Sequence, residues 1–348
     1  MSRFRVLRSL PQALAGDWPG GMVRILLTAM LLGPLVLSGG ACAAPERSEP
    51  EIVSRTYSSP ESRNRTSIDD RDPSEILSMA RELYRQDSLS HRNPPGLHLQ
   101  SASALVVDER GNRIYAKNAQ QIKPIASVTK LMTAMVVLDA GVPLSTRIGI
   151  IEDDRDRLRN SSSRLMIGKA NLTRGELLMV ALMSSDNRAA HALGRTTFRG
   201  GTPAFVKAMN RKAKSLGMYD TYFADSSGLN GQNRSSAEDL VKMVRAAATY
   251  PFIRKTTSTG EMTLHPFADG RALLYRNTNS LVRNPDWNVE ISKTGFINEA
   301  GRCLVMQTRI ADRRLYIVLL NGSGKLTPLG DSNRVRDWLL NGQKTAAR

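Results

Sequence analysis

The sequence has few of the residues that build metal or redox centres. Only two cysteines and four histidines occur among its 348 residues. His91, His98, His191 and His265 lack the spacing of metal ligands, and none is paired with an acid as a serine–histidine mechanism would need. We therefore expect no metal and no other cofactor, and the pattern argues against a zinc peptidase.

Aromatic residues are also scarce, at 5% of the chain, whereas lysine and arginine outnumber aspartate and glutamate by 49 to 32. The resulting net charge of +17 is spread over many segments and is not interleaved with aromatic side chains. This distribution does not indicate a nucleic-acid partner. It predicts a solvated basic surface that would be attracted to polyanions, such as an anionic membrane or wall surface.

A membrane-spanning run is absent as well. The apolar run at residues 25–37 is too short to span a bilayer comfortably, follows several arginines, and precedes small residues with Ala41 and Ala43 in an A-x-A arrangement. This pattern predicts a signal peptide at residues 1–43, with Met22 as an alternative start. We expect an exported protein of the periplasm or cell envelope, and Cys42 leaves a lipid anchor as an alternative to plain cleavage near Ala43.

After plain cleavage, Cys303 is the only thiol, so no intramolecular disulfide could form. Residues 44–96 divide into two parts. Residues 45–73 contain almost no apolar residues, which predicts a disordered tether. Apolar residues at helical spacing after Ser74 predict a peripheral helix.

The remainder, residues 97–341, predicts one α+β domain. A hairpin at residues 102–116 opens it, capped helices follow, and an antiparallel meander closes it with strands at 289–293, 303–310 and 314–321. Thr173 and the segment Ser235-Ser236-Ala237-Glu238 are predicted to cap helices, and Asp331 is predicted to cap a last helix. We expect about five antiparallel strands flanked by helices, beside an inserted, mainly helical lobe at about residues 155–260.

The most informative stretch is PIASVTK at residues 124–130, which runs into an apolar segment. Pro124 suits the first turn of a helix and Gly141 its end. Ser127 and Lys130 are three residues apart, so on a helix their side chains share one face. Burial would lower the pKa of Lys130 and make its amine a usable base for the Ser127 hydroxyl.

Two further motifs make this pair meaningful. Ser185-Asp186-Asn187 follows an apolar segment, and Lys293-Thr294-Gly295 ends a short strand pattern. S-x-x-K, S-D-N and K-T-G in this order are the motif set of penicillin-binding proteins and class A β-lactamases. The sequence resembles the low-molecular-mass penicillin-binding proteins, which are D-alanyl-D-alanine peptidases, over residues 97–338.

The resemblance implies catalytic roles for three side chains and one backbone site. Ser127 would attack a D-alanyl carbonyl and form an acyl-enzyme, Lys130 would be its base, and Ser185 would pass a proton to the leaving amine. The backbone N–H groups of Ser127 and Phe296 would form the oxyanion hole.

The resemblance also implies a substrate-binding set. Asn187 would orient the substrate backbone, Lys293 and Thr294 would anchor a terminal carboxylate, and Gly295 would let a peptide approach the strand edge. The expected partners are peptidoglycan stem peptides and cross-links, with β-lactams as inhibitors.

Two alternatives remain open at this point. A class A β-lactamase would need a glutamate in the region 217–229, which has none, and the segment DSSGL at 225–229 resembles D-alanyl-D-alanine peptidases instead. A catalytically silent wall-binding protein is the second alternative, although all the motif side chains are present. Because the two strands and the helix after Lys293 use nearly all of the remaining sequence, the chain resembles short D-alanyl-D-alanine endopeptidases more than carboxypeptidases.

Overall fold

The computed structural model describes residues 72, 74, 78–79 and 93–346. The predicted signal peptide, Cys42, and most of the predicted tether and peripheral helix lie outside the described residues. Ser74 is helical, and its N–H donates to the Asp72 carboxylate at 2.8 Å.

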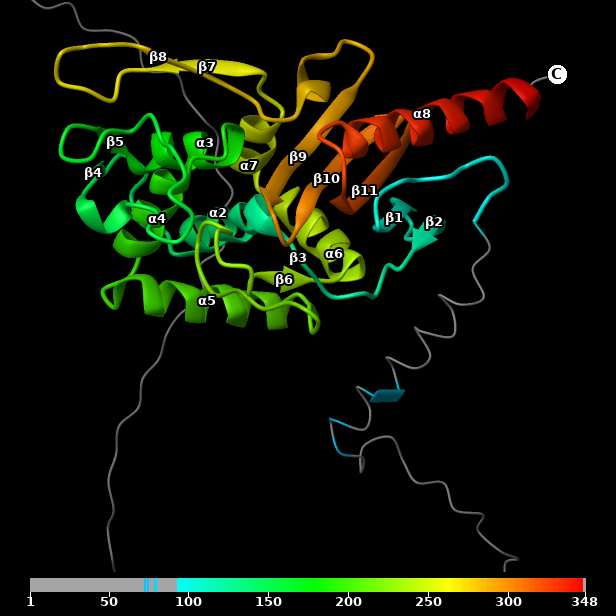
Figure 1. The fold of residues 1–348 in the computed structure, drawn as a ribbon, viewed down its shortest axis with the longest axis horizontal. Helices are drawn as coiled ribbons and strands as arrows, with labels where there is room; N and C mark the ends of the chain where they lie inside the picture. Colours follow the sequence, from blue (N-terminus) through cyan, green and yellow to red (C-terminus); the bar gives the residue numbers. More distant parts are fainter. Residues whose placement is uncertain (1–71, 73, 75–77, 80–92, 347–348) are drawn as a thin grey trace, which may run out of the picture. The chain divides into compact units, whose positions relative to one another are not determined.

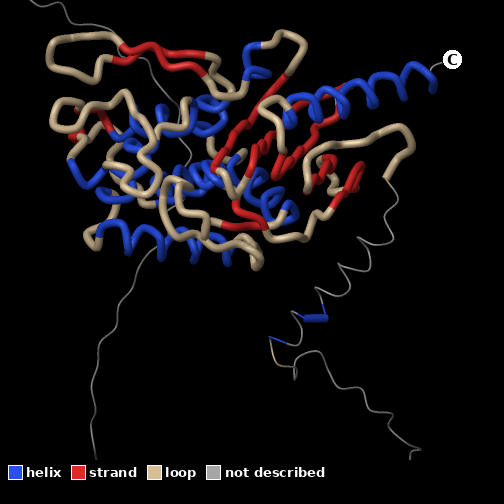
Figure 2. Tube along the Cα trace, in the orientation of Figure 1, coloured by secondary structure: helices blue, strands red, loops and turns tan. Residues whose placement is uncertain are grey.

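A five-stranded antiparallel sheet organises the fold, in the order β2-β1-β11-β10-β9. The N-terminal hairpin and the C-terminal meander therefore meet in one sheet, because β1 pairs with β11 (Figures 1 and 2). This confirms the predicted α+β class. The strands are β1 (Ser103–Asp108), β2 (Arg113–Lys117), β9 (Asn288–Ile297), β10 (Gly301–Ile310) and β11 (Arg313–Gly322).

Both faces of the sheet are covered. Leu105 and Val318 belong to a large core shared with the inner helices, whereas Val106 and Ile317 point to the other face, where the helix α8 (Thr327–Ala346) packs. Side chains alternate between the two faces of a strand, so a strand buried on both sides can be apolar throughout. All six residues of β1 are buried for this reason.

The helices between the hairpin and the meander pack around the buried helix α2. Thr173 and Glu176 form the predicted capping box of α3, and Ser236 caps α6 by accepting the Asp239 N–H. The predicted stop after α2 is confirmed by Gly141, at φ +63°. These helices are α2 (Lys130–Asp139), α3 (Arg174–Met183), α4 (Asn187–Thr196), α5 (Gly201–Ser215), α6 (Ala237–Ala247) and α7 (Pro251–Thr257).

Several local predictions were wrong. Pro124 does not begin a helix but lies in the short strand β3 (Lys123–Pro124), which pairs with β6 (Arg234–Ser235). Asp331 lies inside α8, where its buried carboxylate accepts hydrogen bonds from the segment before β1 instead of capping the helix.

Two small two-stranded sheets were not predicted. The first pairs β4 (Arg147–Gly149) with β5 (Asn171–Thr173), and the second pairs β7 (Glu261–Leu264) with β8 (Leu273–Arg276). The strand β4 has only three residues and is followed by the 3₁₀ turn η3 (Glu152–Asp154). Strands this short carry too few residues for an alternating pattern to stand out.

Candidate active site

Ser127 lies in η2 (Ala126–Thr129), a 3₁₀ turn that runs directly into α2. The predicted α-helical first turn is therefore a tighter turn, with Ala126 at φ +48°. Lys130 is the first residue of α2, and its Nζ lies 2.7 Å from Ser127 Oγ. The three-residue spacing places the two groups in direct contact, as the sequence predicts.

The Lys130 amine is buried and has three neighbours. Its side chain is 1% exposed, and Nζ lies 2.8 Å from Asn187 Oδ1 and 2.6 Å from the carbonyl of Ser227, in addition to Ser127 Oγ. The amide and carbonyl oxygens can only accept hydrogen bonds, whereas a hydroxyl can also donate. A neutral amine can therefore donate its two N–H bonds to these oxygens and keep its lone pair for the Ser127 proton.

Burial also favours the neutral amine. Desolvation lowers the pKa of Lys130 to about 7, although the negative charges of Asp225, Asp186 and Asp156 oppose this shift. The pKa of a general base is most useful near the working pH, so Lys130 has the protonation behaviour that the role requires.

Lys293 meets Ser185 across the site. Ser185 lies between α3 and α4 at φ +64°, and its Oγ accepts a hydrogen bond from Lys293 Nζ at 2.9 Å. The prediction that Lys293 ends its strand was wrong, because β9 continues to Ile297 in register with β10. Burial, together with the charge of Lys130, lowers the pKa of Lys293 well below its ordinary value.

Asn187 connects Lys130 to the loop at residues 153–163. Its Oδ1 accepts from Lys130, and its Nδ2 donates to Ser161 Oγ at 2.8 Å. The neighbouring Asp186 caps α4 by accepting the Ala189 N–H. The Asn187 amide is thus oriented by two protein partners.

Two glycines allow other chain segments to approach the nucleophile closely. A Cβ at Gly295 would lie 2.8 Å from the Ile125 carbonyl oxygen and 3.2 Å from Ser127 N. A Cβ at Gly228, which has φ +85°, would lie 2.0 Å from the Ala126 carbonyl oxygen. Gly295 therefore permits the packing of β9 against η2. The sequence alone did not indicate this role for Gly295.

The remaining predicted residues lie along the same strand. Thr294 Oγ1 donates to Thr278 Oγ1 at 2.6 Å. The Phe296 side chain is 47% exposed, and the guanidinium of Arg302 lies 3.8 Å from its ring centroid. Within the described residues, no group of three histidine, cysteine, aspartate or glutamate side chains could hold a metal ion.

Sequence reasoning missed two parts of the site. The carbonyl of Ser227 contacts Lys130, and Asp225 organises that loop by accepting the N–H groups of Ser227, Gly228 and Asn230. The segment DSSGL resembles D-alanyl-D-alanine peptidases, but its sequence did not indicate that one of its carbonyl groups contacts Lys130. Ser161 was also missed, because a hydroxyl in a polar loop carries no pattern of its own.

The fold and the site define a class of protein. A five-stranded sheet beside a helical lobe, with a buried lysine on a serine hydroxyl and a second lysine on a second serine, is the arrangement of a penicillin-binding serine peptidase. The chain belongs to the peptidase S11 family, whose model is described as D-alanyl-D-alanine carboxypeptidase and matches residues 89–324. It is therefore a serine peptidase of the D-alanyl-D-alanine type.

Similar proteins agree with this assignment. The chain is 43% identical over 278 residues to the D-alanyl-D-alanine endopeptidase of Pseudomonas aeruginosa, covering 78% of this chain and 89% of the relative. It is 41% identical to the enzyme of the same name from Escherichia coli, covering 70% and 79%. Among solved structures, penicillin-binding protein D2 from Listeria monocytogenes in its cefotaxime-bound form matches with a TM-score of 0.62 and 29% identity, over 70% of this chain and 98% of that one.

Proposed function

We propose that the protein is an exported D-alanyl-D-alanine endopeptidase that cleaves peptidoglycan cross-links through an acyl-enzyme on Ser127. The observation that carries the proposal is the 2.7 Å contact between the buried Lys130 amine and the Ser127 hydroxyl. The N-terminal pattern at residues 1–43 supports export, and a wall substrate requires it.

In the first half-reaction, Ser127 Oγ attacks the D-alanyl carbonyl carbon and Lys130 takes the hydroxyl proton. Proton transfer by a positioned base contributes about 10²–10⁴-fold to a rate. The backbone N–H groups of Ser127 and Phe296 are proposed to stabilise the resulting oxyanion. The close packing of β9 against η2 supports this assignment.

The C–N bond then breaks, and the leaving amine needs a proton. Ser185, in contact with Lys293, is proposed to deliver its hydroxyl proton to the leaving amine and to take up in exchange the proton that Lys130 removed from Ser127, so that Lys130 becomes neutral again. In the second half-reaction, water attacks the carbonyl carbon of the acyl-enzyme and Lys130 is proposed to take a proton from the water. The ester C–O bond then breaks as Lys130 returns that proton to Ser127 Oγ, and the carboxylic acid product ionises to a carboxylate. Lys293 and Thr294 are proposed to anchor the substrate carboxylate, and Asn187 to hold Lys130 and the substrate backbone.

The site does not favour a class A β-lactamase. The segment at 217–229 contains no glutamate, and its Asp225 carboxylate already accepts backbone N–H groups of its own loop. A carboxylate so engaged is poorly placed to activate water. We therefore infer that β-lactams acylate Ser127 and remain attached, as expected of a relative of a protein with a cefotaxime-bound structure.

Labelling with a fluorescent penicillin tests the acyl-enzyme. Purified protein should form a stable fluorescent adduct, and Ser127→Ala should form none while melting at a similar temperature. Rapid loss of the label by turnover would point to a β-lactamase instead, and no labelling of the unmodified protein would point to a silent wall-binding protein.

Digestion of cross-linked muropeptides distinguishes the two peptidase types. An endopeptidase releases monomers from purified cross-linked dimers, whereas a carboxypeptidase removes the terminal D-alanine from monomeric pentapeptides. The names of the relatives from Pseudomonas and Escherichia favour the first activity, and the description of the family favours the second. We expect dimer cleavage to be the faster reaction.

A further inference from the structure

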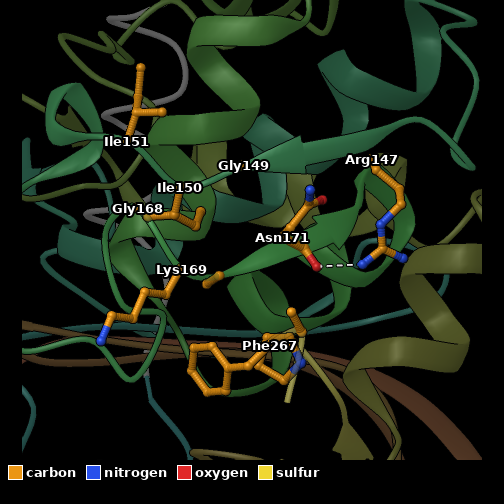
Figure 3. A pocket seen from close by; sticks show the side chains of 11 residues that line it. Arg147, Gly149, Ile150, Ile151, Gly168, Lys169, Asn171 and Phe267 are labelled. Carbon is orange, nitrogen blue, oxygen red and sulfur yellow. Dashed lines mark hydrogen bonds between the residues drawn. The ribbon is translucent and has the colours of Figure 1, made fainter. Parts of the chain in front are cut away.

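A pocket of about 430 Å³ lies between the paired strands β4 and β5 and the segment at 266–268. Figure 3 shows the Arg147 and Lys169 side chains on two sides of the pocket, with Asn171 between them and Phe267 below. This volume falls within the range of about 300–1,000 Å³ that is usual for ligand sites.

Backbone hydrogen bonds hold the walls of the pocket in place. Asn171 N donates to the Pro266 carbonyl at 2.8 Å, and Gly168 N donates to the Ile150 carbonyl at 2.8 Å. Ile150 is 1% exposed and Phe267 is 8% exposed, so the floor is apolar and packed from behind. The pocket is therefore formed before any ligand arrives.

The charge in the pocket is positive. Arg147 and Lys169 line it, and none of the lining residues is acidic. Lys169 forms no side-chain hydrogen bond or ion pair with the residues that the structure describes. Arg147 donates to the Asn171 carbonyl at 2.7 Å, which leaves donors of its guanidinium for a ligand.

A third cation, which does not itself line the pocket, contacts the aromatic ring of Phe267. The Arg271 guanidinium stands 4.4 Å from the centroid of the Phe267 ring. The acidic residue next to this segment, Asp269, accepts the backbone N–H of Arg271 at 2.9 Å. Cations beside an apolar floor match a ligand that presents carboxylates next to aliphatic groups.

The helix α3 relates the pocket to the active site. Its first residue, Arg174, follows β5 of the pocket wall, and its last residue, Met183, lies two residues before Ser185. Ten helical residues measure about 15 Å. A stem peptide of about five residues spans at most about 18 Å when extended, which is comparable with the length of this helix.

We propose that this pocket is a second peptidoglycan-binding site, which takes a carboxylate-bearing stem peptide at a distance from the bond that is cleaved. The inference rests on the proposed function and adds to it. A recessed, preformed pocket with an apolar floor fits a peptide better than a flat lipid surface. The pocket would hold the enzyme on cross-linked wall without taking part in the chemistry.

Blocking the catalytic serine isolates the second site. The protein is first acylated completely with penicillin, and binding of an uncross-linked disaccharide tetrapeptide is then measured by calorimetry. We expect the acylated protein to bind this probe and Lys169→Glu to weaken binding by about tenfold, because a charge-assisted contact is lost. Lys207→Glu on α5 is the matched control, since it makes the same charge change at an exposed position away from the pocket, and it should bind like the unmodified protein.

Each result has one meaning. If penicillin fails to label the protein, the proposed function itself is wrong. If labelling succeeds but the acylated protein does not bind the probe, or Lys169→Glu binds it equally well, the pocket proposal is wrong. Loss of binding to vesicles of anionic phospholipid in Lys169→Glu, with tetrapeptide binding unchanged, would also overturn it in favour of a lipid surface. Arg147→Gln provides a second variant should Lys169→Glu melt at a lower temperature.

Discussion

At the scale of single residues, the reactivity of Ser127 depends on the three oxygens around the Lys130 amine. Two of them, from Asn187 and Ser227, can take the amine protons, and the third is the nucleophile itself. Only the neutral amine has a lone pair for the hydroxyl proton. The protonation state of Lys130 should therefore control acylation.

This leads to a pH prediction. The pKa of Lys130 is lowered to about 7 by burial. Below that pH the amine is protonated and cannot accept a proton, so the acylation rate should fall; it should rise through about pH 7 and level off above. The rate of labelling by fluorescent penicillin between pH 5 and 9 measures this profile.

Lys130→Met should remove the base and, with it, the rise of the acylation rate through about pH 7. It keeps a long apolar side chain in a buried position, so the melting temperature should change little, while acylation should slow by about 10²–10⁴-fold. A near-normal labelling rate in Lys130→Met would exclude Lys130 as the base. A profile with no inflection near pH 7 would show that another group controls the step.

The sequence predicted contacts between residues only where a local rule connects them. Ser127 and Lys130 share a helix face because of their spacing, and this contact is confirmed. The Ser227 carbonyl reaches Lys130 from 97 residues away through a backbone atom that every residue possesses. No side-chain pattern identifies such a contact, so it could be found only from the fold.

At the scale of elements, the turn η2, which carries Ser127, is packed between two segments. Each of these segments has a glycine at the point of contact, Gly228 in one and Gly295 in the other. The turn η2 and the strand β9 are in direct contact at this point. Gly228 approaches Ala126 so closely that any Cβ would overlap its carbonyl oxygen, at 2.0 Å. The position of Ser127 thus depends on the loop that contains Gly228.

Gly228→Ala should therefore displace the nucleophile. A shift of about 1 Å in a reacting group can cost about 10²-fold in rate, and we expect a loss of this order in penicillin acylation. The positive φ should add about 1–3 kcal/mol of destabilisation. Labelling kinetics and a denaturant titration measure the two effects separately.

Gly217→Ala is the matched control for this variant. Gly217 also has a positive φ, of +69°, but a Cβ there would meet nothing within 4 Å. It should share the loss of stability and keep a normal acylation rate. Equal acylation rates in the two alanine variants would show that the close approach of Gly228 does not position Ser127.

Element boundaries show a second limit of the sequence. The sequence predicts a strand end at Lys293 because the strand pattern stops at Lys293-Thr294-Gly295, and glycine often marks a turn. In the structure the glycine lies within β9, where the backbone of η2 packs against the strand. Glycine at a turn and glycine at a close approach look the same in sequence.

At the scale of the whole molecule, the fold class was predictable because both ends of the domain carry strong strand patterns. The order of the sheet follows from pairing β1 with β11, which joins segments about two hundred residues apart in a common antiparallel arrangement. The short strand pairs β4–β5 and β7–β8 were missed, and with them the pocket between β4, β5 and the loop that joins β7 to β8.

The same long-range connection gives a stability prediction. The Asp331 carboxylate of α8 is 0% exposed and accepts hydrogen bonds from the N–H groups of Gln100 and Ser101, each at 2.8 Å, and from Ser101 Oγ at 2.7 Å. Asp331→Asn replaces one accepting oxygen with an NH₂ group that faces these donors. We expect a loss of about 1–3 kcal/mol in the free energy of unfolding, measured by denaturant titration.

The acylation rate should not fall together with the stability, because Asp331 connects α8 to the segment before β1 and contacts no active-site residue. The penicillin acylation rate of folded Asp331→Asn should equal that of the unmodified protein at a temperature where both are folded. Asp286→Asn, at an exposed position, makes the same chemical change and should alter neither quantity. A slower acylation rate in folded Asp331→Asn would mean that the α8 face of the sheet influences the catalytic face, and that stability and chemistry are not separable in this fold.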